Sequence, residues 1–250
     1  MTVLPATDAL LRTRDGDLLP FEPSRWGERA DHDERALLAD VDGPVLDVGC
    51  GPGRLVHHLV LAGVTAMGVD PAPGAVALAR QRGAPVLQRG IWEHLPGEGR
   101  WGTVLLFDGN VGIGGDPVAL LRRCGELLGP RGRVLAELEA PGAPSRRLEA
   151  RIERGAEATP WFPWATLGVA DAGTVAARAG LEIVQMWHTG GAERSQRWFV
   201  LFGAPGGGGQ RCAVNPILAD ALRADREPVL SLRAARMASP PLEGGTSGVS

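Results

Sequence analysis

A glycine-rich segment near residue 50 constrains the fold of this chain more than any other feature. Residues 45–53 read Val-Leu-Asp-Val-Gly-Cys-Gly-Pro-Gly, and apolar residues recur at helical spacing over 54–62. This order predicts a buried strand, a tight loop and a helix. Glycine suits a backbone that turns sharply or lies against a ligand, and a helix N-terminus offers free N–H groups to an anion. Asp70 closes the next predicted strand, where a carboxylate suits hydrogen bonds to ribose hydroxyls.

Strands and helices alternate along the first half of the chain. Strands are predicted at 44–48, 65–70, 84–88, 101–107 and 133–139, and helices at 54–62, 73–82 and 117–128. Such alternation indicates a parallel sheet with right-handed crossovers. Further on, a turn is predicted at 129–132, helices at 145–154, 174–179 and 217–226, and an antiparallel hairpin from 181–188 and 197–203.

The composition fits one α/β domain with extensions. The chain has 250 residues, of which 44% are hydrophobic, enough to bury a full core. We expect an N-terminal segment at 1–30 that could act as a lid, the main domain at 31–204, and a Gly/Pro-rich, mostly disordered tail at 205–250.

Charge and cysteine content exclude several classes of function. The net charge of −3 gives no electrostatic case for a nucleic-acid partner. The chain contains no lysine, which excludes Schiff-base and P-loop chemistry, and its three cysteines lack the spacing of a zinc or disulfide framework, so no metal is predicted. Without an apolar run of ~20 residues or a signal-peptide pattern, we expect no membrane contact and a cytoplasmic monomer or homodimer.

The form of the glycine loop discriminates between two cofactor classes. A dinucleotide site prefers G-x-G-x-x-G, in which the third glycine lets the helix pack on the strand. Here the pattern is G-x-G-x-G, and Arg54 stands where the dinucleotide form needs glycine. Asp47, just before the loop, can hold the loop or accept a hydrogen bond from a cationic amine. The site therefore suits a ligand with α-amino and α-carboxylate groups better than a pyrophosphate.

These motifs resemble those of the class I S-adenosylmethionine (SAM)-dependent methyltransferases. The match comprises 45–54 as the first motif, Val69-Asp70 as the acid of the second strand, 101–110 as the fourth strand with its loop, and 129–135 as the entry to the fifth strand. It covers about residues 30–203. More narrowly, 95–117 resembles a group of small actinobacterial methyltransferases of unassigned substrate.

The resemblance implies a Rossmann-like, doubly wound sheet of seven strands in the order 3-2-1-4-5-7-6, with strand seven antiparallel. It also implies SAM as cofactor. The residues expected to contact it are Asp47, Gly49, Cys50, Gly51, Gly53, Asp70, Pro71, Gly90, Ile91, Trp92 and Asp108. The family often has an Asp after strand three that accepts from the adenine amino group. Here Arg89-Gly90 stands there, which leaves backbone groups and stacking, or Glu93, to hold adenine.

No motif names a general base, because methyl transfer needs one only for some nucleophiles. Ligands of parallel sheets bind at the carboxyl ends of the strands, which makes Asp108, Glu137 and His188 the catalytic candidates. Glu137 and Glu139 share a strand face, and a buried ion pair or a solvated strand end explains them equally without catalysis.

The function that these features favour is SAM-dependent methyl transfer to an O, N or C nucleophile of a small molecule. The alternatives are a non-catalytic SAM-binding or scaffold protein and, less favoured because of Arg54, a nicotinamide-dependent oxidoreductase. Trp161, Phe162 and Trp164 form either an apolar lid over the substrate or anchors of their own loop.

Overall fold

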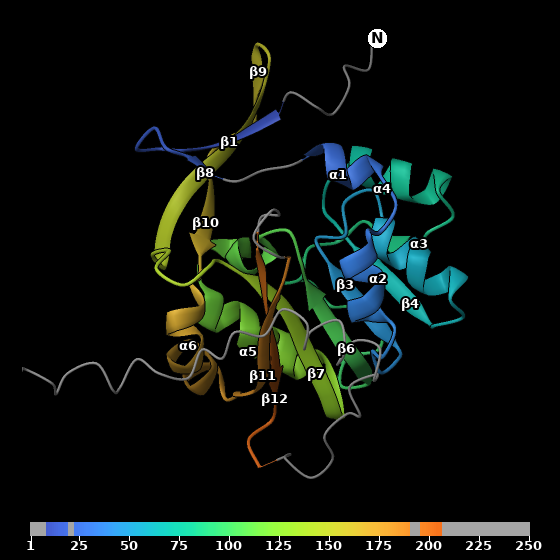
Figure 1. Ribbon diagram of the computed structural model, residues 1–250. Helices are drawn as coiled ribbons and strands as arrows, with labels where there is room; N and C mark the ends of the chain where they lie inside the picture. The colour runs from blue at the N-terminus through green and yellow to red at the C-terminus, as the bar shows by residue number, and fades with distance from the viewer. Residues whose placement is uncertain (1–8, 20–22, 191–195, 207–250) are drawn as a thin grey trace, which may run out of the picture.

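The computed structural model describes residues 9–19, 23–190 and 196–206, which form two sheets with flanking helices (Figure 1). The larger sheet has seven strands in the order β5-β4-β3-β6-β7-β12-β11. In chain order these are β3 (Val45–Val48), β4 (Ala66–Val69), β5 (Val86–Leu87), β6 (Trp101–Leu106), β7 (Leu128–Leu138), β11 (Glu182–Thr189) and β12 (Arg197–Gly203). β12 is antiparallel to both of its neighbours, while the pairs from β5 to β7 are parallel. The expected strand order is therefore confirmed.

Helices cover both faces of this sheet. The helices α2 (His32–Leu38), α3 (Arg54–Leu61) and α4 (Pro73–Gln81) bury apolar side chains against one face, and α5 (Pro117–Leu127) and α6 (Ala172–Ala179) against the other. In Figure 1 the first group lies on the right and the second at lower left. α6 ends at Gly180, whose φ of 79° is left-handed, as its sequence predicts.

The smaller sheet joins the N-terminal segment to the chain after β7. Its order is β10-β8-β1-β2, with β9 paired to β8. The strands are β1 (Ala9–Thr13), β2 (Leu18–Leu19), β8 (Arg146–Arg154), β9 (Glu157–Ala158) and β10 (Phe162–Thr166). The short helix α1 (Pro23–Gly27) then leads to α2. The segment expected as a separate lid thus contributes strands to a sheet shared with residues 146–166.

The helix predicted at 145–154 is wrong, because these residues form β8. Leu148, Ala150 and Ile152 alternate with charged residues, a period that places apolar side chains on one face of a strand. β8 gains its hydrogen-bonding partners from β1 and β10, which are remote in sequence and override the local helical tendency.

The turn predicted at 129–132 is also wrong, because it lies inside β7. Trp101 pairs with Leu128 and Thr103 with Arg133, so the extra residues bulge out of the ladder. A Cβ at Gly132 would lie 2.6 Å from the Trp101 carbonyl oxygen, which explains the glycine. The helix predicted at 217–226 falls outside the described residues.

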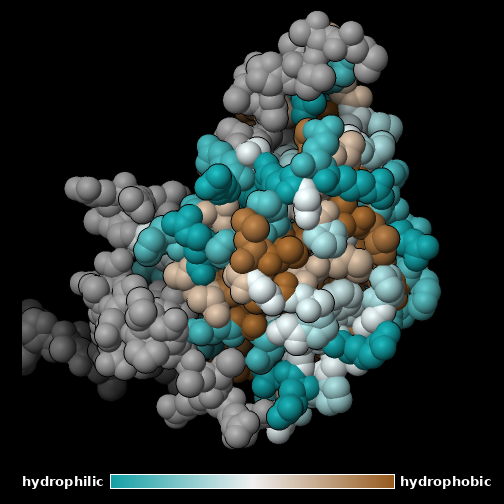
Figure 2. All heavy atoms as spheres, turned by 90° about the vertical axis from the view of Figure 1, so that its right-hand side faces the viewer, coloured by the Kyte–Doolittle hydropathy of each residue, from teal (hydrophilic) through white to brown (hydrophobic). Residues whose placement is uncertain are grey.

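The face on the right of Figure 1 carries apolar side chains on its surface. Figure 2 shows them gathered near the centre of this face. Among the described residues, the exposed large hydrophobic side chains include Val60 and Leu61 of α3 and Leu78 of α4. No helix among the described residues is long and apolar enough to span a membrane.

Candidate functional site

The glycine loop between β3 and α3 has the conformation its sequence predicts. Gly49, Gly51 and Gly53 all have positive φ, at 70°, 53° and 74°. A Cβ at Gly49 would lie 2.7 Å from the Asn110 amide nitrogen, and one at Gly53 2.8 Å from Ala84 Cβ. Gly51 has nothing within 4 Å of its Cβ position. The outer two glycines permit close packing, and the middle one faces open space that a ligand can enter.

Asp70 ties the second parallel strand to this loop. Its Oδ2 accepts from the Gly51 backbone N–H at 2.9 Å and its Oδ1 from that of Ala72 at 2.8 Å. Burial raises the pKa of Asp70, and these two hydrogen bonds oppose the rise. The carboxylate therefore stands beside the glycine loop, as expected of a ribose ligand.

Asp47 is a buried acid whose carboxylate has no partner in the described part of the chain. It lies in β3 with 3% of its surface exposed, and no described residue forms a hydrogen bond or ion pair with it. Burial raises its pKa to about 7; nearby Arg54 opposes this, and Asp108, Asp70 and Glu34 add to it. Burying a carboxylate is costly unless it is paired. A cationic ligand bound next to Asp47 would therefore stabilise its carboxylate.

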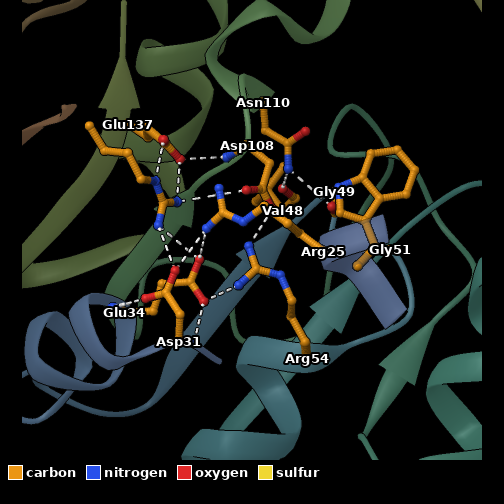
Figure 3. A network of polar contacts seen from close by, with 12 residues as sticks. Arg25, Asp31, Glu34, Val48, Gly49, Gly51, Arg54, Asp108, Asn110 and Glu137 are labelled. Carbon is orange, nitrogen blue, oxygen red and sulfur yellow. Dashed lines mark hydrogen bonds and ion pairs between the residues drawn. The ribbon is translucent and has the colours of Figure 1, made fainter. Parts of the chain in front are cut away.

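An ion-pair network around Glu34 and Arg54 joins α1, α2, α3, the loop after β6 and β12 (Figure 3). Arg54, only 5% exposed, forms ion pairs with Glu34 of α2 and with Asp108, where Nη2 lies 2.6 Å from Oδ2. Glu34 is fully buried, and its Oε1 also forms ion pairs with Arg25 Nη2 and Arg197 Nη1, each at 3.0 Å. Arg54, which the sequence marks as incompatible with a dinucleotide loop, thus fastens the glycine loop's helix to α2.

The loop after β6 is held from both sides. Glu137 Oε2 accepts from the Asp108 backbone N–H at 2.9 Å, and Asn110 donates to the carbonyl oxygens of Val48 and Gly49 at 2.8 and 3.0 Å. Arg197 forms a two-pronged contact with Glu137 at 2.7 and 2.8 Å. Of the two explanations of Glu137, the structure therefore shows the ion pair.

The segment after β5 lies where an adenine ring is expected. Ile91 is buried, whereas Trp92 is 50% exposed and lies against Gly114, whose Cβ position is 2.8 Å from the indole. Glu93 accepts from the Gly90 N–H at 2.7 Å, so its carboxylate is engaged in closing this turn. This arrangement favours backbone groups and stacking over Glu93 as the means of holding adenine. Pro71 is exposed after β4.

The side chains of Cys50 and His188, both predicted as site residues, point away from the glycine loop and the ion-pair network. Cys50 is buried toward the sheet, where a Cβ on Gly68 would meet its Sγ at 2.4 Å, so only its backbone can serve a ligand. The His188 ring packs on Trp198 with centroids 4.8 Å apart. Side chains alternate along β12, so His188 and Trp198 share the face opposite to Arg197. The structure does not bring His188 to the network.

The aromatic cluster of β10 divides between the two faces of the smaller sheet. The guanidinium groups of Arg14 and Arg151 lie 5.2 and 4.6 Å from the centre of the Trp161 ring. Phe162 and Trp164 alternate to the other face and meet edge to face at 5.9 Å. Trp164 packs on Gly112 of the segment η2 (Asn110–Gly115), so it anchors the smaller sheet to the loop after β6.

The sequence did not identify the residues that form ion pairs with Asp108 and Glu137. Asp31 and Glu34 form a capping box at the start of α2, a pattern of D-x-x-E that is visible in the sequence. Arg197, at the start of an apolar strand, carries no local signal of its role. Its contact with Glu34 spans 163 residues of sequence.

Comparison with known proteins agrees with this geometry. Residues 45–132 match the family model described as a methyltransferase domain. Over 109 residues the chain is 36% identical to a ubiquinone biosynthesis O-methyltransferase of Azorhizobium caulinodans, a match that covers 42% of this chain and 43% of that protein. A second such enzyme, from Pseudomonas paraeruginosa, is 35% identical over 111 residues, which cover 41% of this chain and 46% of the enzyme. The chain thus spans less than half the length of the curated relatives it matches.

A solved structure resembles most of the chain. The SAM-dependent methyltransferase of Bacteroides fragilis, in complex with S-adenosyl-L-homocysteine, superposes with a TM-score of 0.66 at 20% identity, covering 80% of this chain and 89% of that one. This likeness shows the fold. The matched domain at 45–132 and the observed strand order agree with the resemblance of this sequence to class I SAM-dependent methyltransferases.

Proposed function

We propose that this protein binds SAM and transfers its methyl group to an O, N or C nucleophile of a small molecule. The observation that carries the proposal is Asp47, a buried carboxylate without a partner among the described residues, at the mouth of the glycine loop. The α-amino group of SAM is a cation of the kind this acid lacks. The names of the ubiquinone biosynthesis relatives support a small-molecule acceptor.

The remaining predicted contacts fit the same ligand. Gly51, between the closely packed Gly49 and Gly53, leaves room for its methionine part, and Asp70 lies beside the loop, where it can bind the ribose hydroxyls. We assign the adenine ring to Pro71 and to residues 90–92, and the backbone at Asp108 to the amino group. Arg54 stands where a dinucleotide loop needs its third glycine, and its side chain is buried there in two ion pairs, which favours SAM over a nicotinamide dinucleotide.

Bound SAM supplies a methyl group already activated by the positive charge on sulfur. The work left to the protein is to align the acceptor and to exclude water. Arginines already engage the carboxylates of both Asp108 and Glu137, so the structure does not favour either as a direct contact of the acceptor. Phe162 and Trp164, above the loop after β6, supply apolar surface next to which an acceptor can be held.

Titration calorimetry tests the proposal with three ligands: SAM, S-adenosylhomocysteine (SAH) and NAD. We expect micromolar binding of SAM and SAH and none of NAD. Asp70→Ala should weaken SAM binding by about 1–3 kcal/mol, the scale of charge-assisted hydrogen bonds to ribose. Asp42→Ala is the matched control, since this exposed acid precedes β3 at the opposite edge of the sheet. Failure of SAM and SAH to bind would refute the proposal, and an unchanged affinity in Asp70→Ala would refute the ribose assignment.

A further inference from the structure

Asp108 has an unusual backbone conformation for its residue type. Among the residues that the structure describes it is the one non-glycine with a positive φ, at 56°. A left-handed backbone brings Cβ close to the carbonyl oxygen, so an aspartate stays there only where neighbouring contacts hold it. Such residues concentrate at functional sites. The contacts that hold Asp108 are therefore candidates for a role in the site.

Glu137 supplies the contact that replaces the ladder where β6 leaves the sheet. The pairing of β6 with β7 runs as far as Leu106 and Ala136. Beyond that point the Asp108 N–H donates to the carboxylate of Glu137. Asp108 is half-buried, and its N–H keeps this acceptor only if the Glu137 side chain keeps its orientation.

Arg197 fixes that orientation. Its Nε and Nη2 bind the two oxygens of Glu137 at 2.7 and 2.8 Å, and its guanidinium stacks over Phe199 at 5.2 Å. A two-pronged contact restricts a carboxylate more than a single hydrogen bond does. Arg197 itself is held by Glu34, 3.0 Å away. The chain of contacts thus runs from α2 through β12 and β7 to the Asp108 backbone.

We propose that Glu137 and Arg197 are positioning residues, which hold the Asp108 backbone in the left-handed conformation that receives the amino-acid end of the cofactor. The inference rests on the proposed function, in which the backbone at Asp108 meets the cofactor's amino group. Neither side chain accepts the substrate proton. Both oxygens of Glu137 are engaged, and the pair acts through the shape of the loop.

Calorimetric titration with SAH tests the role of Glu137, with Glu139→Gln as the matched control. Glu139 lies two residues further on and bonds no described residue through its side chain. Glu137→Ala should raise the Kd for SAH about tenfold, because it removes a hydrogen bond to a charged group. Glu137→Gln keeps an acceptor for Asp108 but loses one of the two hydrogen bonds from Arg197, so it should raise the Kd less than Glu137→Ala does. Arg197→Met keeps an unbranched side chain next to Phe199 but loses both hydrogen bonds to Glu137, so it should also raise the Kd for SAH.

A second substitution separates positioning from a merely structural role. Glycine adopts a φ of 56° without steric cost, so Glu137→Ala should weaken SAH binding far less when Asp108→Gly is already present. A tenfold loss in both backgrounds, or an unchanged Kd in Glu137→Ala, would overturn the inference while leaving the proposed function intact. Wild-type protein that binds neither SAM nor SAH would overturn both.

Discussion

Glu34 is the acid on which the N-terminal helices depend for their contact with the rest of the protein. It is fully buried and receives Arg25, Arg54 and Arg197. Its carboxylate also accepts from the Asp31 backbone N–H to complete the capping box of α2. Replacement by alanine removes all four contacts at once. We therefore expect Glu34→Ala to destabilise the protein more than any exposed acid would.

The magnitude follows from the partners that remain. Leaving a buried charge with no partner costs about 3–5 kcal/mol. Here Arg54 keeps Asp108, Arg197 keeps Glu137 and Arg25 keeps Asp31. A cost of about 2 kcal/mol for the ion pairs is therefore reasonable, and loss of the capping hydrogen bond adds about 1 kcal/mol. The sum, about 3 kcal/mol, corresponds to a fall in Tm of about 6–12 °C for a chain of this size.

Urea unfolding followed by tryptophan fluorescence measures this loss through linear extrapolation. Asp33→Ala is the control, because it removes another acid from the first turn of α2, one whose only ion-pair partner among the described residues is the exposed His32 at 3.4 Å. We expect a loss of about 0.5 kcal/mol there, the scale of a helix-dipole interaction. If Glu34→Ala lost no more than Asp33→Ala, the network would contribute nothing measurable to stability and the reasoning would be refuted.

Three further predictions concern Asp47, the loop after β6 and helix α5. Burial raises the pKa of Asp47 from 3.8 to about 7, so between these values the folded protein retains a proton that the unfolded chain has released. The free energy of unfolding contributed by this group therefore falls as the pH rises through that range. Asp47→Asn should gain stability over the wild type between pH 5 and pH 8 in thermal unfolding while losing SAM affinity; a stability difference independent of pH would contradict this assignment. Gly112→Ala should cost about 1–3 kcal/mol in urea unfolding, because its Cβ would lie 2.2 Å from the Ala165 carbonyl oxygen. Gly125→Ala, in α5 with its nearest neighbour at 3.7 Å, should instead stabilise by up to about 1 kcal/mol.

The elements of the main sheet were predictable because their signals are local. Each strand is a short apolar run, and each following helix carries its own period and often its own cap, as Asp116 does for α5. β8 also carries a local signal, since Leu148, Ala150 and Ile152 alternate with charged residues as in a strand, and the helix prediction overlooked it. The strands that pair with β8, at residues 9–13 and 162–166, are remote in sequence and leave no local signal.

The residues of the candidate site also fall into those with a local sequence signal and those without one. The glycine loop and Asp70 were found because one strand–loop–helix unit and the next strand contain them. The ion pairs of Glu34 and Arg197 were not found, because a salt bridge between remote segments leaves no periodic trace in the sequence. Sequence reasoning could place acids at the carboxyl edge of the sheet, but it could not tell which of them were already neutralised.

The interaction partners of the acids at this edge of the sheet indicate which acid is left to bind the cofactor's cationic group. Asp108 has Arg54, Glu137 has Arg197, and Asp70 has two backbone N–H groups. Asp47 alone of these four has no partner among the described residues, and it is the most buried. An unpaired buried charge is stabilised either by taking up a proton or by binding a cation. Because its pKa of about 7 makes both accessible near neutrality, cationic ligands should bind with release of a proton, and their affinity should rise with pH.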